Sequence, residues 1–166
     1  MALMAFMYAV GQKSGQIKGS ITQKGREDSV GVLAYSHEIM RPLDAHSGLA
    51  TGARIHKPLI VEKELDKSTP IFYNLMCTSE NLTSVTLKFW TAQLKTASGV
   101  GSEVQHYTIK LINAHIASME SSMPDISHPD LAKIPQTEKI AFTYQKIEWT
   151  WNDGGIAASD DWEARV

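Results

Sequence analysis

The six histidines of this chain are its best candidates for binding a metal ion, but their spacing does not favour such a site. Histidine binds metals such as zinc through a neutral ring nitrogen, and two such ligands commonly lie four residues apart on one helical face. The histidines are instead scattered, at His37, His46, His56, His106, His115 and His128. The pattern therefore predicts no metal site. We interpret His37 and His115, which lie on expected strands, as hydrogen-bonded and partly buried side chains.

Residues for covalent or acid–base catalysis are also poorly arranged. The single cysteine, Cys77, lies among apolar residues, where we expect a buried and unreactive thiol. No Gly-x-Ser-x-Gly sequence is present to hold a nucleophilic serine. In the run Glu62–Lys67, interleaved lysines neutralise the carboxylates, which favours a solvated or interfacial row of ion pairs over a general-acid site. The glycine-containing segment Gly11–Gly19 lacks the Gly-Lys-Ser/Thr ending of a phosphate-binding loop and predicts a turn.

The bulk composition is that of a globular protein. Its 166 residues, 43% of them hydrophobic, are enough for one core, so we expect a single domain over residues 1–166. The 16 basic and 18 acidic residues leave a net charge of −2, which offers no positive excess for binding nucleic acid. No apolar run approaches the roughly 20 residues needed to cross a bilayer. The apolar N-terminus has no basic residue before Lys13, so we interpret it as a first strand rather than a cleaved signal peptide.

Alternation of side chains along the chain predicts mostly β-strands. Val85, Leu87 and Phe89 alternate with less apolar neighbours, and β-branched or aromatic residues dominate the other candidate strands. These are Tyr107–Ile116, Ile140–Trp151, Ser29–Met40, Arg54–Leu65 and, more weakly, Ile17–Ile21. Within Ile140–Trp151 the apolar face changes parity, which predicts a β-bulge near Gln145.

One segment has helical spacing instead. Ser68 can cap a helix that begins with Pro70 in its first turn and continues to Cys77. Apolar residues spaced three and four apart predict its buried stripe, which is Ile71, Phe72, Leu75 and Met76.

Three segments with glycine or proline and little periodicity predict loops, at Pro42–Gly52, Thr96–Ser102 and Ser121–Pro135. In the first, Leu43 and Leu49 are the only sizeable apolar side chains, which gives the segment little reason to pack on its own domain. We therefore expect it to reach a neighbouring molecule. A β-rich body with such a loop, and without a pattern for chemistry, favours an assembling or binding protein that uses no cofactor.

Several separate segments resemble the hemolysin-coregulated protein (Hcp) family, in the same order and over essentially the whole chain. They are Lys24–Val30, Leu33–Ile39, Thr51–Leu59, Glu62–Pro70, Tyr107–Leu111, Tyr144–Trp151, Asp153–Ile156 and Asp160–Trp162. The sequence departs from the family at Trp90, where an arginine often follows the aromatic residue, and in the long loop Thr96–Ser102.

The resemblance implies a mainly β fold, a compact barrel of two antiparallel sheets with one short flanking α-helix and a long extended loop. It implies a structural tube subunit of the type VI secretion system, in which hexameric rings stack and small effectors travel in the bore. The implied partners are further copies of the chain, the VgrG spike protein, contractile sheath proteins and small secreted effectors. The protein would leave the bacterial cytoplasm for the medium or a target cell without a cleaved signal peptide.

The resemblance places Ser36 on a strand that faces the bore. The long loop and its flank supply candidates for contacts between subunits or rings, which are Leu43, Asp44, His46, Leu49, Thr51, Arg54 and His56. We assign no catalytic and no metal-binding residue. The alternatives are a monomeric β-barrel that binds a small ligand and, after it, a hydrolase with an unrecognised carboxylate pair. Light scattering separates them, since a ring has about six chain masses and a binding module has one.

Overall fold

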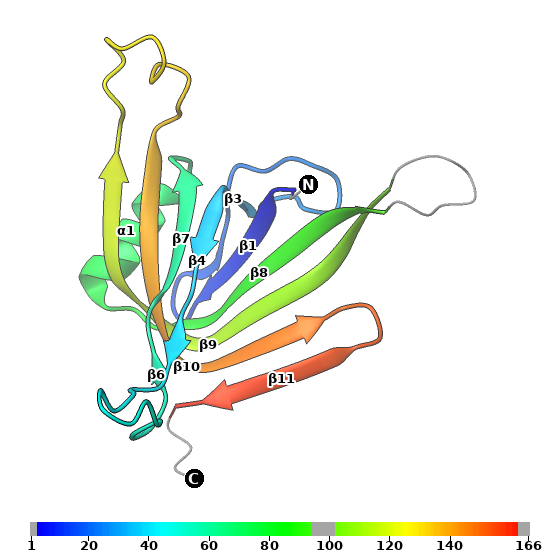
Figure 1. The fold of residues 1–166 in the computed structure, drawn as a ribbon. Helices are drawn as coiled ribbons and strands as arrows, with labels where there is room; N and C mark the ends of the chain where they lie inside the picture. The colour runs from blue at the N-terminus through cyan, green and yellow to red at the C-terminus, as the bar shows by residue number, and fades with distance from the viewer. Residues whose placement is uncertain (1–2, 94–101, 163–166) are drawn as a thin grey trace.

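A nine-stranded antiparallel sheet dominates residues 3–93 and 102–162, which are the part of the chain that the computed structural model describes (Figure 1). Its strands, with those of a small second sheet, are β1 (Ala5–Gly11), β2 (Gly15–Ile17), β3 (Val30–Val32), β4 (Ala34–Ser36), β5 (Ile39–Met40), β6 (Ile55–His56), β7 (Leu59–Glu64), β8 (Leu82–Gln93), β9 (Ser102–Ser122), β10 (Thr137–Trp151) and β11 (Ile156–Asp161). The same part of the chain holds one helix, α1 (Thr69–Thr78), and no helix long and apolar enough to span a membrane.

The strand order of the large sheet is β2-β1-β8-β9-β10-β7-β4, with β3 paired to β1 and β11 paired to β10. Strand β3 pairs with β1, near one end of the strand order, and β4 pairs with β7, near the other end. The segment from Val30 to Ser36 therefore connects the two ends of the sheet around the core. Strands β5 and β6 pair only with each other among the described residues. The expected fold class is confirmed as mainly β, with two antiparallel sheets and, in the described residues, one short helix.

The segment Ser29–Met40 forms three short strands rather than one. Val30 and Val32 point into the core from β3, and the chain then leaves β1. At Leu33 the backbone N–H bonds to the Glu62 carbonyl of β7, so the following residues pair with a different strand. The change of partner interrupts the strand.

The β-bulge expected near Gln145 is wrong. The pairing of β9 with β10 keeps its register across this point, and the register shift lies between Ala141 and Phe142. The irregularity opposite Gln145 is Asn113, whose φ of 51° is left-handed and whose amide donates to the Gln145 side chain. Asparagine tolerates this backbone better than most residues, so the strand turns there without an extra residue.

The predicted helix is confirmed, and two of its details differ. Phe72 and Leu75 are buried, as the apolar stripe predicted. The Ser68 hydroxyl donates to the Asp66 carboxylate instead of capping the helix. Cys77 is exposed, so the prediction of a buried thiol is wrong. It follows Leu75 by two residues, about 200° around a helix with 3.6 residues per turn, and therefore lies on the opposite face.

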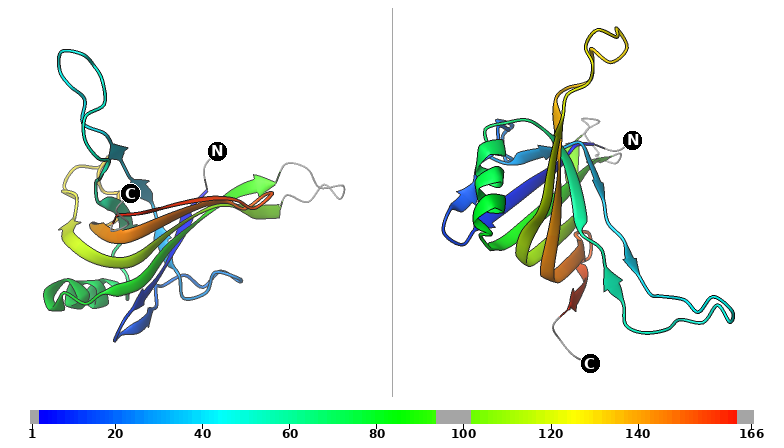
Figure 2. Two further views of the ribbon diagram at one scale, coloured as in Figure 1. Left: turned by 90° about the horizontal axis from the view of Figure 1, so that it is seen from below. Right: turned by 90° about the vertical axis from the view of Figure 1, so that its left-hand side faces the viewer.

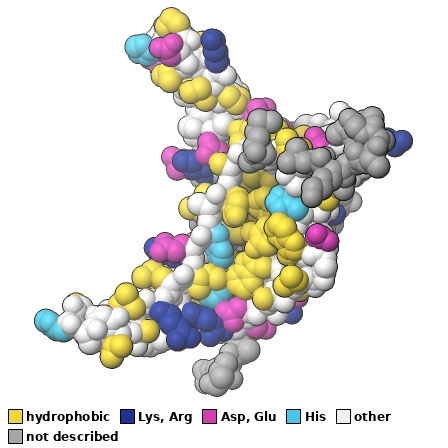
Figure 3. All heavy atoms as spheres, turned by 45° about the vertical axis from the view of Figure 1, so that its right-hand side comes forward, with side chains coloured by type: hydrophobic (Ala, Val, Ile, Leu, Met, Phe, Trp, Pro, Cys, Tyr) yellow, Lys and Arg dark blue, Asp and Glu magenta, His cyan; other side chains and the backbone are white. Residues whose placement is uncertain are grey.

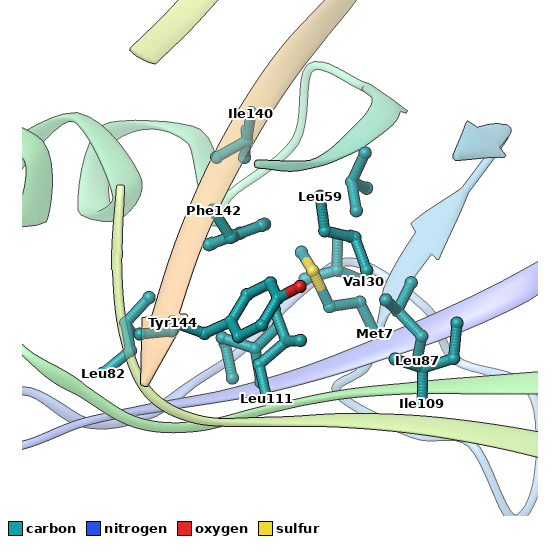
Figure 4. Packing of buried hydrophobic residues seen from close by; sticks show 14 of the residues in the cluster. Met7, Val30, Leu59, Leu82, Leu87, Ile109, Leu111, Ile140, Phe142 and Tyr144 are labelled. Carbon is teal, nitrogen blue, oxygen red and sulfur yellow. The ribbon is translucent and has the colours of Figure 1, made fainter. Parts of the chain in front are cut away.

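The core lies between the strands and the inner face of α1. Its side chains come from β1, β2, β3, β7, β8, β9, β10 and α1, and Figure 4 shows several of them converging, among them Met7, Leu87, Leu111 and Phe142. Lys63 is also completely buried, so of the solvated or interfacial row of ion pairs expected here, the solvated form does not hold at this residue, although its ion pairs do form. Its register partner Glu138 on β10 is buried with it, so the two charges satisfy each other.

The predicted loops fall between strands where the structure describes them. Residues 96–101 lie outside the described residues, and Ser102 begins β9. The loop predicted from Ser121 starts two residues later, because β9 continues to Ser122. The segment Gly11–Gly19 contains the expected turn, which joins β1 to β2, and also all of β2, whose first residue Gly15 has a φ of 67°.

Candidate functional site

A hairpin projects from the body between β5 and β6 (Figure 2). We call residues 41–54 the arm. Its Leu43 and Leu49 side chains are 66% and 69% exposed. Large apolar side chains gathered on a projecting segment are typical of a contact surface. The arm can therefore bury these leucines against another molecule without rearranging the body.

The tip of the arm is ordered by its own hydrogen bonds. The Asp44 carboxylate accepts bonds from the Ser47 N–H (2.7 Å), the Ser47 hydroxyl (2.8 Å) and the His46 N–H (3.1 Å). The Ser47 N–H contributes most to holding the pKa of Asp44 below its usual value. Further back, the Thr51 N–H donates to the Pro42 carbonyl at 2.8 Å. A hairpin that is already ordered loses less conformational entropy when it binds a partner.

The C-terminal end of the arm, at Arg54, and the adjoining strand β6 bond to β11. The Arg54 guanidinium bonds to both oxygens of Asp160, and its Nη2 also donates to the Asp161 carbonyl at 2.9 Å. His56 Nε2 lies 2.6 Å from the same Asp160 carboxylate. The bond from Arg54 is the main cause that holds the pKa of Asp160 below its usual value. This planar, paired geometry fixes the direction in which the arm leaves the body.

A tyrosine between two histidines completes the base of the arm. Tyr144 Oη lies 2.7 Å from His56 Nδ1 and 2.7 Å from His37 Nε2, so its hydroxyl donates to one ring and accepts from the other. The Trp162 ring packs on His56 with the ring centroids 4.7 Å apart. Burial raises the pKa of Tyr144 and lowers the pKa of His37. Burial therefore favours the neutral form of both groups, and this bonding pattern accommodates it.

Arg54 and His56 thus contact their own body, although the sequence suggested them as residues at an interface. We call His37, Arg54, His56, Tyr144 and Asp160 the arm base. The histidines were visible as candidates for hydrogen bonding in the sequence. Tyr144 and Asp160 were not predicted as partners of His56, because they lie 88 and 104 residues from it in the sequence.

Ser36 is exposed on a polar face of the sheet. It pairs with Ile60 on β7. On the next strand, β10, Lys139 lies opposite Glu62 of β7 and Glu120 of β9. A shallow hollow here is lined by Ala34, Tyr35, Ser36, Ile60, Glu62 and Lys139. Opposite charges therefore face one another across three neighbouring strands on this part of the sheet.

Trp90, where the sequence departs from the resemblance noted above, contacts an arginine from elsewhere in the chain. Trp90 packs under the Arg26 guanidinium, 3.7 Å from the ring centroid, and Arg26 also lies over Phe6. Its charge is paired with Glu103 at 2.5 Å. The side chain of Arg26 is 8% exposed, so it attaches the loop before β3 to the rim of β8 and β9.

The remaining histidines form no cluster with other possible metal ligands among the described residues. His115 is exposed rather than partly buried, which corrects the interpretation drawn from its strand. Within the described ranges, no three His, Cys, Asp or Glu side chains lie where they could share a metal ion. The assignment of no metal-binding and no catalytic residue stays a prediction.

Comparisons with known proteins point to one family. A family model described as "Type VI secretion system effector, Hcp" matches residues 6–151. A curated relative from Pseudomonas aeruginosa, named "Major exported protein", is 34% identical over an alignment of 175 residues that covers 100% of this chain and 99% of the relative.

Solved structures of similar proteins share the fold. A mutant form of the Hcp1 protein from the E. coli EAEC 042 pathovar has 31% identity and a TM-score of 0.82, covering 96% of this chain and 99% of its own. A structure named "Crystal structure of Hcp protein" has 29% identity and a TM-score of 0.86, covering 98% and 99%. The secreted protein Hcp3 from Pseudomonas aeruginosa has 28% identity and a TM-score of 0.75, covering 99% and 100%.

Proposed function

Because the chain belongs to the Hcp family of the type VI secretion system, we propose that it is a structural subunit of the secretion tube. Six copies close into a ring, and rings stack into a tube. The observation that carries this proposal is the match to a relative over the full length of both chains. A ring requires a contact between two different surfaces that closes on itself, and stacking requires a second contact that repeats along the axis.

The arm supplies one of these contacts. Its exposed Leu43 and Leu49 bind a neighbouring subunit or ring, while Asp44 keeps the tip ordered. His46 and Thr51 are exposed beside them on the same arm. Arg54 and His56 act indirectly, because their bonds to the body set the direction of the arm.

The face that carries Ser36 lines the bore and contacts small effectors. Its exposed serine and mixed charges support this assignment, since a hydrated wall lets cargo bind weakly and leave. The tube meets the VgrG spike protein at one end and contractile sheath proteins along its outside. It leaves the bacterial cytoplasm with the effectors for the medium or a target cell. The chain performs no catalytic step in this role.

Light scattering and electron microscopy of the purified protein test the proposal. We expect particles of about six times the 18.3 kDa chain mass with a central hole. A monomer at high concentration would refute the tube subunit, and a monomer that binds a small ligand would favour the alternative binding module.

Two variants test the assigned surfaces. Leu49→Ser is expected to weaken the contact made by the arm, while Ile126→Ser, which changes a side chain 67% exposed outside the arm, is the matched control. If both variants assemble as the natural protein does, the arm is not a contact. Ser36→Arg is expected to keep rings intact and to lower effector retention, and normal effector levels would contradict its place in the bore.

A further inference from the structure

The apolar face of the sheet continues beyond the core along β8, β9, β10 and β11. Side chains that face one another across these strands form successive rows. The row of Val85, Leu111 and Ile147 is fully buried, and in the next row Leu87 and Ile109 are buried while Trp149 is half-buried. The last row is Phe89, Tyr107, Trp151 and Ile156. We call this last row the apolar overhang.

The apolar overhang is open to solvent in the single chain. Trp151 is 46% exposed and Ile156 is 70% exposed. Tyr35 packs on Phe89 at its edge, with the ring centroids 4.9 Å apart, and is itself 44% exposed. Figure 3 views the molecule from this side and shows hydrophobic side chains gathered in a hollow. Aromatic side chains grouped in this way, without charged residues between them, are typical of the centre of a protein interface.

The reverse face of the same strands has the opposite character. Lys88, Thr108 and Thr150 lie opposite one another there, and Thr86, Lys110 and Glu148 form the row beside them. An antiparallel sheet with one polar and one apolar face is built to be covered on the apolar side. The apolar overhang is therefore the part of the apolar face that the described residues of the chain leave open.

The opposite side of the molecule carries α1, far from the overhang in two perpendicular views (Figures 1 and 2). The helix contains no Asp, Glu, Lys, Arg or His. Its outer face presents Tyr73, Asn74 and Cys77, all exposed. Surface helices usually carry charged residues on the side that faces water. An exposed helix face without charges is suited to burial against another protein.

We infer that the apolar overhang of one copy covers the outer face of α1 on the next copy around the ring. The inference rests on the proposed function, because it assigns the two halves of the contact that closes the ring. In a cyclic ring of identical subunits, the surface on one side of a copy meets the surface on the opposite side of its neighbour. The overhang and α1 are two uncharged surfaces on opposite sides of this chain, so they meet this requirement.

Cys77 reports on the contact directly, because it is the single thiol of the chain and lies on the outer face of α1. The natural protein and its variants are treated with a thiol-reactive dye, and particle mass is followed by light scattering. In the ring we expect Cys77 to react about tenfold or more slowly than in separated subunits, because a covering neighbour excludes the reagent.

Trp151→Glu places a charge in the overhang and is expected to give separated subunits with a reactive Cys77. Thr150→Glu places the same charge on the polar reverse face and is expected to keep the ring and the slow reaction. Asn74→Lys places a charge on the outer face of α1, which is the other half of the contact, and we again expect separated subunits. Circular dichroism measures whether each variant is folded. If Trp151→Glu does not fold, Asn74→Lys tests the contact instead.

The outcomes separate this inference from the proposed function. Rings in which Cys77 reacts as fast as in separated subunits would overturn the contact and leave the tube subunit standing. Rings that persist in a folded Trp151→Glu or Asn74→Lys variant would do the same. A natural protein that remains monomeric would overturn the proposed function itself.

Discussion

The buried pair of Lys63 and Glu138 offers the sharpest test of how this fold is stabilised. Both side chains are 0% exposed, and their charged groups lie 2.6 Å apart between neighbouring strands. The Lys63 ammonium also donates to the Asp66 carboxylate at 2.9 Å and to the Glu64 carbonyl at 2.8 Å. The Thr69 hydroxyl donates to Glu138 at 2.9 Å, which connects α1 to β10.

Replacing Lys63 by methionine keeps an unbranched side chain and removes its charge. Glu138 would then be a buried carboxylate whose Oε1 keeps the Thr69 hydroxyl, while its Oε2 already lacks a partner among the described residues. Removing one member of a buried ion pair costs about 3–5 kcal/mol of unfolding free energy. A chain of this size loses about 2–4 °C in Tm per kcal/mol, so Tm should fall by roughly 6–20 °C.

Thermal and urea unfolding at one fixed protein concentration measure this loss, since assembly makes Tm depend on concentration. Lys63→Met/Glu138→Leu removes both charges and should recover most of the stability, because well-packed apolar residues replace such pairs at little cost. A loss below about 1 kcal/mol for Lys63→Met would refute the reasoning, because it falls short of the cost of a stranded buried charge. A double variant no more stable than the single one would refute it equally.

Three further changes test other parts of the chain. Tyr144→Phe removes the hydroxyl between His37 and His56 and should cost about 1–3 kcal/mol in urea unfolding, whereas no measurable loss would mean that water replaces it. Burial holds the pKa of His37 below its usual value, so the unfolded chain binds more protons, and the unfolding free energy should fall as pH drops below about 6.5. His37→Gln should flatten that slope, and an unchanged slope would assign it to other groups. Gly19→Ala would place a methyl group 2.2 Å from the Ser29 carbonyl oxygen, so we expect a loss of about 1–3 kcal/mol, and unchanged stability would show that the backbone there can shift freely.

Much of the secondary structure was predictable because its signals are local. Alternation around Val85 and Leu87 marks β8, since successive side chains of a strand point to opposite faces. Pro70 and the apolar spacing after it mark α1. The exposed leucines of the arm followed from the same reasoning, because a long loop with only Leu43 and Leu49 has too little apolar surface to pack on its own body.

The candidate site was predictable only in part. The projecting loop was predicted, but the bonds of Arg54 and His56 to the body were not, because their partners lie more than 80 residues away in the sequence. The apolar overhang was also missed. Trp151 reads as an ordinary inward-facing strand residue, and its exposure becomes visible only once the extent of the strands around it is known.

The sequence by itself determined the longer strands, the helix and the family, because alternation, helix-start residues and ordered motifs depend on residues close together in the chain. Only the tertiary structure decided which polar groups are buried and which apolar groups are exposed. Lys63 is buried because β10 brings Glu138 opposite it, and Cys77 is exposed because the other face of α1 meets the core. Burial depends on which faces the pairing of distant strands covers, and no local pattern contains that information.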